Sequence, residues 1–193
     1  MADATLRLVG EHGCFGGVQR FYEHDSTVIG LPMRFSVFLP AQALPGNVGD
    51  KVPAIVYLAG LTCNEETFMI KAGAQRRAAE LGIALIAPDT SPRGAKLPGE
   101  SDNWDFGLAA SFYLDATVAP WSQHYRMESY LTQELPALLA KTLPIDTERL
   151  GLFGHSMGGH GALTLALRHP SLFKSLSAFA PICAPTQCPW GQK

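Results

Sequence analysis

Short apolar runs alternate with helix-forming segments along most of the 193 residues. Each apolar run is four to six residues long and is bounded by Gly, Pro or polar residues, a pattern typical of buried strands. Parallel strands need crossover helices, which cover both faces of the sheet. The pattern therefore predicts an α/β fold with a mostly parallel sheet and helices on both faces. The predicted strands are Arg34–Leu39, Ala54–Ala59, Ile83–Ala87, Leu150–Phe153 and Ser175–Ala180, with Phe15–Tyr22 a candidate antiparallel strand; the predicted helices are Glu65–Leu81, Tyr125–Lys141 and Gly158–His169.

Length and composition narrow the class of protein further. The 193 residues suit a single domain with a sizeable core, and 47% of them are hydrophobic. A net charge of −2 gives no case for a nucleic-acid or anionic-membrane partner. The first ten residues lack the basic start and apolar run of a signal peptide. The four cysteines show no C-x-x-C spacing, so we expect reduced thiols in a cytoplasmic protein.

The segment Gly154-His155-Ser156-Met157-Gly158 matches G-x-S-x-G, the nucleophile elbow of serine hydrolases. It follows a predicted strand and opens a predicted helix, which is the context that the motif requires. Ser156 is therefore the candidate nucleophile. The N–H of Met157, at the positive end of the helix, is a candidate donor to an oxyanion. A chance match in a glycine-rich chain is the alternative.

A second oxyanion donor is expected from the loop after an earlier strand. Here that loop is Gly60-Leu61-Thr62-Cys63-Asn64, and the N–H of Leu61 is the candidate. An ordinary strand-to-helix turn explains the same residues equally well. Cys63 is either a reactive thiol near the site or a small buried hydrophobic residue.

The long polar segment Asp89–Gly107 and the end of the chain hold further candidates. Its carboxylates (Asp89, Glu100, Asp102, Asp105) either meet a cationic part of a substrate or, as is commoner, are solvated. Trp104, Phe106 and Trp190 either wall an acyl pocket or belong to the core. His155 and His160 do not form a zinc motif and no carboxylate accompanies them, so neither a metal site nor a cofactor is predicted. His169 is expected to meet the last carbonyls of its helix.

Several motifs spread over the chain resemble the S-formylglutathione hydrolase, or esterase D, family. They are Cys14-Phe15-Gly16-Gly17, Glu23-His24-Asp25-Ser26, Gly60-Leu61-Thr62-Cys63, Ala87-Pro88-Asp89-Thr90-Ser91-Pro92-Arg93-Gly94, Trp104-Asp105-Phe106-Gly107, Phe112-Tyr113-Leu114-Asp115-Ala116-Thr117, the elbow block Phe153–Leu163, Ser177–Cys183 and Cys188-Pro189-Trp190-Gly191.

The resemblance implies an α/β-hydrolase fold and hydrolysis of a glutathione thioester, S-formylglutathione, to glutathione and formate in formaldehyde detoxification. It also implies general esterase activity on small acyl esters, no cofactor and a homodimer. Ser156 matches the family nucleophile, Leu61 and Met157 match its oxyanion donors, and Cys63 matches a thiol near the site.

The carboxyl-terminal end departs from the family pattern. From Met157 to Lys193 there is no Asp or Glu, whereas the family's catalytic Asp and His come from a later segment. We therefore expect residues 1–193 to be one α/β-hydrolase domain, incomplete at its carboxyl terminus, with the acid and base beyond Lys193. A separate carboxyl-terminal fragment docked on the chain would complete it. The alternatives are a general carboxylesterase and, in a different class, a noncatalytic fragment or binding module.

Overall fold

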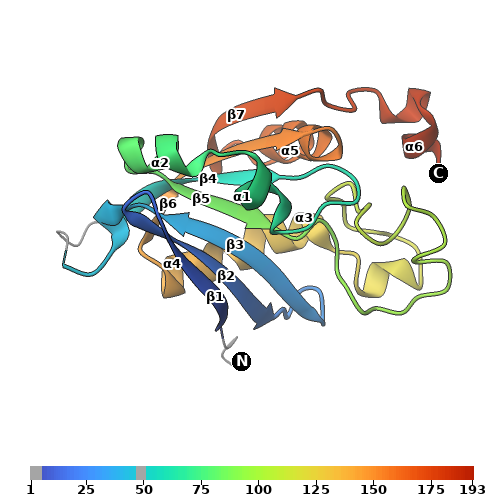
Figure 1. Cartoon of the computed structure of the whole chain (residues 1–193). Helices are drawn as coiled ribbons and strands as arrows, with labels where there is room; N and C mark the ends of the chain where they lie inside the picture. Colours follow the sequence, from blue (N-terminus) through green and yellow to red (C-terminus); the bar gives the residue numbers. More distant parts are fainter. Residues whose placement is uncertain (1–5, 47–50) are drawn as a thin grey trace.

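The computed structural model describes residues 6–46 and 51–193, which form one seven-stranded sheet with helices against it (Figure 1). Residues 1–5, part of the stretch in which no signal peptide is expected, lie outside the described ranges. The strands are β1 (Arg7–Cys14), β2 (Gly17–Asp25), β3 (Pro32–Leu39), β4 (Val52–Leu58), β5 (Ala84–Pro88), β6 (Ile145–His155) and β7 (Phe173–Phe179). The α-helices are α1 (Thr67–Lys71), α2 (Gln75–Leu81), α3 (Met127–Ser129), α4 (Leu135–Thr142), α5 (Met157–Arg168) and α6 (Pro189–Gln192).

The strand order is β1-β2-β3-β5-β4-β6-β7. The first three strands form an antiparallel meander, and β3 joins β5 antiparallel. The remaining pairs, β5 with β4, β4 with β6 and β6 with β7, are parallel. All strands except β1 and β3 therefore point the same way, which confirms the predicted, mostly parallel α/β-hydrolase fold.

Alternating residues of the central strands face two separate hydrophobic clusters, as a side-chain period of two requires. The larger cluster packs one face of the sheet, including Val56 and Leu152, against α4 and α5. The smaller one packs the other face, including Leu85, against Phe68 of α1 and Ala78 of α2. Figure 1 shows α2 and α4 on opposite sides of the sheet. None of the helices in the described ranges is long and apolar enough to cross a membrane.

Three local predictions need correction. The helix predicted over Glu65–Leu81 is two helices, because the chain takes a positive φ of 64° at Gly73 between them. The helix predicted over Tyr125–Lys141 is interrupted by a π-helical turn over Tyr130–Glu134, directly before α4, whose first turn holds Pro136. Proline lacks the N–H that an α-helical turn needs, so the hydrogen bonding adjusts there. Strand β1 was missed because its residues are mostly exposed and carry no apolar alternation.

Candidate active site

Ser156 lies between the end of β6 and the start of α5, as the elbow motif predicts. Its backbone has φ 58° and ψ −119°, a conformation that costs a non-glycine residue about 1–3 kcal/mol. Two hydrogen bonds hold this turn: the Ser156 N–H donates to the Phe179 carbonyl (3.0 Å), and the His160 N–H donates to the Ser156 carbonyl (3.0 Å). The serine residue is only half-buried.

The glycines that flank the serine are needed for close backbone contacts. A Cβ atom on Gly158 would lie 1.9 Å from the Leu58 carbonyl oxygen of β4, and one on Gly154 would lie 2.1 Å from the Gly158 carbonyl oxygen. No side chain fits at either position. The sharp turn at Ser156 therefore depends on both glycines.

The loop after β4 lies directly beside the elbow. A Cβ on Gly60 would be 3.3 Å from the Cβ of Ser156 and 3.5 Å from the His155 carbonyl oxygen. Leu61, the next residue, is half-buried. The Thr62 N–H donates to the Ala109 carbonyl (3.1 Å), and Thr62 has a positive φ of 67°, so the loop is tied in place just after Leu61.

Met157 begins α5 and its side chain is fully buried. Its Sδ accepts a hydrogen bond from the Phe112 N–H (3.4 Å). The first N–H groups of a helix have no partner within the helix and carry partial positive charge. The structure thus brings Ser156, Met157 and the Leu61 loop together at one edge of the sheet.

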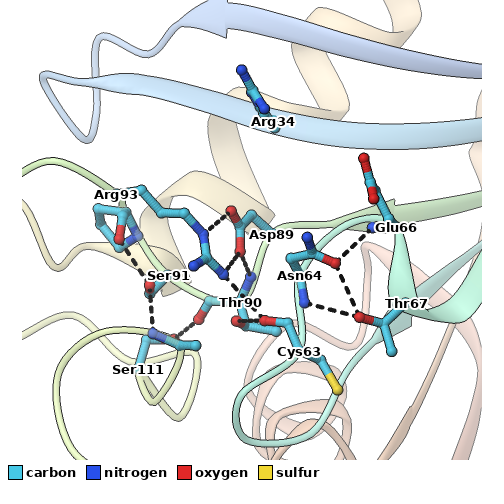
Figure 2. Close-up of polar contacts among 12 residues, drawn as sticks. Arg34, Cys63, Asn64, Glu66, Thr67, Asp89, Thr90, Ser91, Arg93 and Ser111 are labelled. Carbon is cyan, nitrogen blue, oxygen red and sulfur yellow. Dashed lines mark hydrogen bonds and ion pairs between the residues drawn. The ribbon is translucent and has the colours of Figure 1, made fainter. Parts of the chain in front are cut away.

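Cys63 lies in the same loop, half-buried, next to a polar cluster (Figure 2). Its carbonyl oxygen accepts hydrogen bonds from the Thr90 hydroxyl (2.6 Å) and from Nη2 of Arg93 (3.2 Å). Figure 2 shows the Cys63 sulfur atom pointing away from Asp89 and Arg93. The carbonyl group anchors the loop, and the thiol lies on its other side. All four cysteines are free in the structure.

The carboxylates of the long segment after β5 differ from the solvated residues that are commoner in loops. Asp89 is buried and makes an ion pair with Arg93 at 2.6 Å. Glu100 is buried and accepts a hydrogen bond from the Tyr125 hydroxyl (2.7 Å). Asp105 is buried and pairs with Lys193 at 2.5 Å, whereas Asp102 is exposed. Most of these carboxylates hold the loop together.

Trp190 lies on α6 and packs edge-on against Trp104, with ring centroids 6.4 Å apart. Trp104 is 60% exposed, so it belongs neither to the core nor to a closed acyl pocket. Phe106 packs against Trp121 instead. The hydrogen bonds and ring contacts of Trp190 in the described ranges do not involve the Ser156 turn, and its proximity to the site stays a prediction.

The histidines do not supply a base for Ser156 in the structure as described. His160 is buried and its Nδ1 bonds the Ile182 carbonyl oxygen (2.8 Å). His169 pairs with Glu128 at 3.0 Å rather than with the end of its helix, which corrects the prediction. Within residues 6–46 and 51–193, no group of three or more His, Cys, Asp or Glu side chains is placed to hold a metal ion.

Sequence reasoning missed one group of residues at the site. The segment Ala109–Tyr113 has positive φ at Ala109, Phe112 and Tyr113, and it contacts both the Leu61 loop and Met157. The spacing of apolar residues does not predict such a segment. Its signal in the sequence is the family motif that begins at Phe112.

The sheet, the strained serine between a strand and a helix, and the adjoining glycine-led loop define an α/β-hydrolase-like fold. The family model described as "Putative esterase" matches residues 26–193. The chain therefore belongs to this esterase family.

Among the proteins similar to this chain are several S-formylglutathione hydrolases. The chain is 52% identical over 189 residues to the S-formylglutathione hydrolase of Mus musculus. The aligned residues cover 98% of this chain and 66% of the mouse protein. It is 51% identical over 189 residues to that of Paracoccus denitrificans, with the same coverage. The structure of an S-formylglutathione hydrolase from Agrobacterium tumefaciens superposes with a TM-score of 0.91 at 46% identity, covering 96% of this chain and 65% of that one. The chain thus spans slightly less than two thirds of the length of these homologues.

Proposed function

We propose that this protein is a serine thioesterase that hydrolyses S-formylglutathione to glutathione and formate, as a step in formaldehyde detoxification. The observation that carries the proposal is the strained backbone of Ser156 beside Gly60, which presents the hydroxyl group at the edge of the sheet. The relatives that are about 50% identical to this chain are S-formylglutathione hydrolases, which supports the choice of substrate.

In the proposed mechanism, the Ser156 hydroxyl oxygen attacks the thioester carbonyl carbon while its proton passes to a histidine base. The N–H groups of Leu61 and Met157 stabilise the resulting oxyanion. The carbon–sulfur bond then breaks, and the glutathione thiolate leaves with the proton from the histidine. Water attacks the formyl ester by the same route and releases formate and the free serine.

We assign neither the histidine base nor its carboxylate partner to a residue of the described ranges. Within the described ranges, no hydrogen bond joins a histidine to the Ser156 hydroxyl group. Following the family resemblance, we place both groups in sequence beyond Lys193, so that the α/β-hydrolase domain is completed by a later segment. The same resemblance suggests a homodimer in the cytoplasm.

The test is the change Ser156→Ala in the whole protein, with S-formylglutathione as substrate. We expect kcat/KM to fall by roughly 10³-fold or more, because the nucleophile is lost. Ser171→Ala, at a serine that follows the end of α5, is the matched control and should leave activity unchanged. Activity of Ser156→Ala within tenfold of the unaltered protein would refute the proposal.

A general carboxylesterase is the second candidate, because the matching family model describes esterases without naming a substrate. The ratio of kcat/KM for S-formylglutathione to that for a short aryl ester separates the two candidates. The thioesterase proposal predicts a ratio well above one.

A further inference from the structure

A polar cavity of about 390 Å³ opens between the start of β3, the end of β5 and the loop after β4. Figure 2 shows Arg34 on β3 across from Asn64, Asp89 and Arg93. The charged and amide side chains that line it are Glu23, Arg34, Asn64, Glu65, Asp89 and Arg93. Both signs of charge therefore meet in one cavity beside the Cys63 loop.

Several hydrogen-bond donors in this cavity have no acceptor among the residues that the structure describes. Nε of Arg34 donates to Glu23 (2.8 Å), but its two Nη groups have no partner in the described part of the chain. The side-chain oxygen of Asn64 accepts from Glu66 N–H and from Thr67, which leaves its NH₂ group as a donor. A guanidinium fork beside an amide NH₂ group matches a carboxylate ligand.

Glu65 provides a negatively charged group in the same cavity, which would bind a cation. It lines the cavity, is only 5% exposed, and its carboxyl group has no side-chain partner among the described residues. Arg93 does not serve it, because that guanidinium is held by Asp89 through two hydrogen bonds of 2.6 and 2.8 Å. Burial, with the nearby charge of Asp89, raises the pKa of Glu65. The positive charge of Arg34 opposes this shift only in part. A buried carboxylate that has no hydrogen-bonded cation is costly, so a bound ammonium group would stabilise it.

We propose that this cavity binds the zwitterionic γ-glutamyl end of glutathione, with the ammonium group on Glu65 and the α-carboxylate on Arg34 and Asn64. The inference rests on the proposed function. The γ-glutamyl residue carries its ammonium and carboxylate on one carbon atom, whereas the glycine end of glutathione carries only a carboxylate. Only the γ-glutamyl end satisfies both halves of the cavity.

The spacing of the strands agrees with this arrangement. Ser156 follows β6 and Asp89 follows β5, and the single strand β4 lies between them. Two strand spacings amount to about 10 Å. The thioester is on the side chain of the central cysteine, and the eight bonds from its carbonyl carbon to the α-carbon of the γ-glutamyl residue extend roughly 10 Å. A thioester at Ser156 can therefore place its γ-glutamyl end in the cavity. The bond from Arg93 to the Cys63 carbonyl links the cavity directly to the loop that carries Leu61.

The test compares Glu65→Gln with Glu66→Gln in the whole protein. Glu66 is the exposed neighbour and does not line the cavity, so it is the matched control. For S-formylglutathione we expect Glu65→Gln to raise KM roughly 10- to 100-fold at constant kcat, the usual effect of losing a charged hydrogen bond. With the S-formyl thioester of N-acetyl-Cys-Gly, which lacks the γ-glutamyl residue and whose acetylated nitrogen cannot take up the formyl group, Glu65→Gln should behave like the control.

Arg34→Gln, at a half-exposed side chain, gives the same test at a position where folding is not at risk. Equal KM changes for both thioesters, or no change for either, would overturn the inference while leaving the thioesterase intact.

A binding measurement keeps the inference testable if the protein does not turn over S-formylglutathione, which would refute the proposed function instead. Calorimetric titration of Ser156→Ala with S-methylglutathione, a stable thioether, should show binding that Glu65→Gln weakens by a similar factor. S-methyl Cys-Gly should bind more weakly and be insensitive to Glu65→Gln. Equal affinity for the two thioethers would overturn the inference.

Discussion

The hydroxyl group of Tyr113 donates a hydrogen bond of 2.8 Å to the main-chain carbonyl of Ala59. Ala59 immediately precedes the loop that holds Leu61. Tyr113 is fully buried, and its ring lies 2.6 Å from the position that a Cβ on Gly161 of α5 would take. One side chain therefore supports both the loop and the helix that carry the candidate oxyanion donors.

Tyr113→Phe should weaken both the fold and the reaction. The Ala59 carbonyl would lose its buried partner, at a cost of about 1–3 kcal/mol in the free energy of unfolding, measured with urea. Loosening of the Leu61 loop should lower kcat for a short ester by roughly tenfold, with KM unchanged. Tyr22→Phe is the control, because its hydroxyl makes only a 3.5 Å contact with Arg20. Equal effects of the two changes would argue against this role of Tyr113.

Ser156→Gly and Ser156→Ala both remove the candidate nucleophile, and the glycine variant should be the more stable of the two. Glycine adopts the backbone angles at this position without strain, whereas alanine does not. We expect the free energy of unfolding of Ser156→Gly to exceed that of Ser156→Ala by about 1–3 kcal/mol. At Ser171, where φ is not positive, the glycine variant should instead be no more stable than the alanine variant. A less stable Ser156→Gly would show that the turn is not strained.

Gly158→Ala should disrupt the elbow. The added methyl group would overlap the Leu58 carbonyl oxygen, which belongs to the backbone of β4 and cannot turn aside. We expect a loss of about 3 kcal/mol or more in the free energy of unfolding, measured by thermal or urea denaturation. Gly13→Ala is the matched control, because a Cβ there would have no neighbour within 4 Å. Comparable stability of the two variants would contradict the close contact between β4 and α5.

The buried imidazole of His24 should make the protein less stable in mild acid. His24 packs on Tyr130, with its Nε2 3.0 Å from the Tyr130 hydroxyl oxygen, and the Nδ1 of His24 has no hydrogen-bond partner among the described residues. Burial lowers the pKa of His24, and the positive charge of Arg7 lowers it slightly further. The negative charges of Glu134 and Asp25 raise this pKa, but their effects are smaller than that of burial. The unfolded state then binds more protons below a pH of about 6.5, so unfolding becomes easier as pH falls through that value.

The measurement is the free energy of unfolding between pH 7 and pH 5. We expect the contribution of His24 to the slope to approach about 1.4 kcal/mol per pH unit, and His24→Gln should remove it. His12→Gln, at an exposed histidine on β1, should leave the slope unchanged. An unchanged slope in His24→Gln would show that this imidazole does not govern the acid response.

Sequence patterns predicted the parts of the fold in which burial follows a simple period. The buried runs at β4 and β5 and the segment that opens α5 were found within a few residues, as was the elbow at Ser156. The break at Gly73 was missed because a glycine within a helix-rich segment is often tolerated. The burial of Asp89 and Glu100 was missed because their partners, Arg93 and Tyr125, are set by loop geometry. The backbone conformation of Tyr113 could not be predicted either, because bulky residues rarely adopt a positive φ.

The pairing of β4 with β6 also has a consequence for how the protein folds. Leu58 aligns with Gly154, so this contact closes about half of the chain into a loop. Closing a long loop costs entropy before any contact rewards it, and parallel pairing of distant strands is slow for that reason. Ser156 and Gly60 can meet only after β4 and β6 have paired. The site should therefore be among the last parts to form during refolding, and a chain halted before that step would carry a relaxed, unreactive serine.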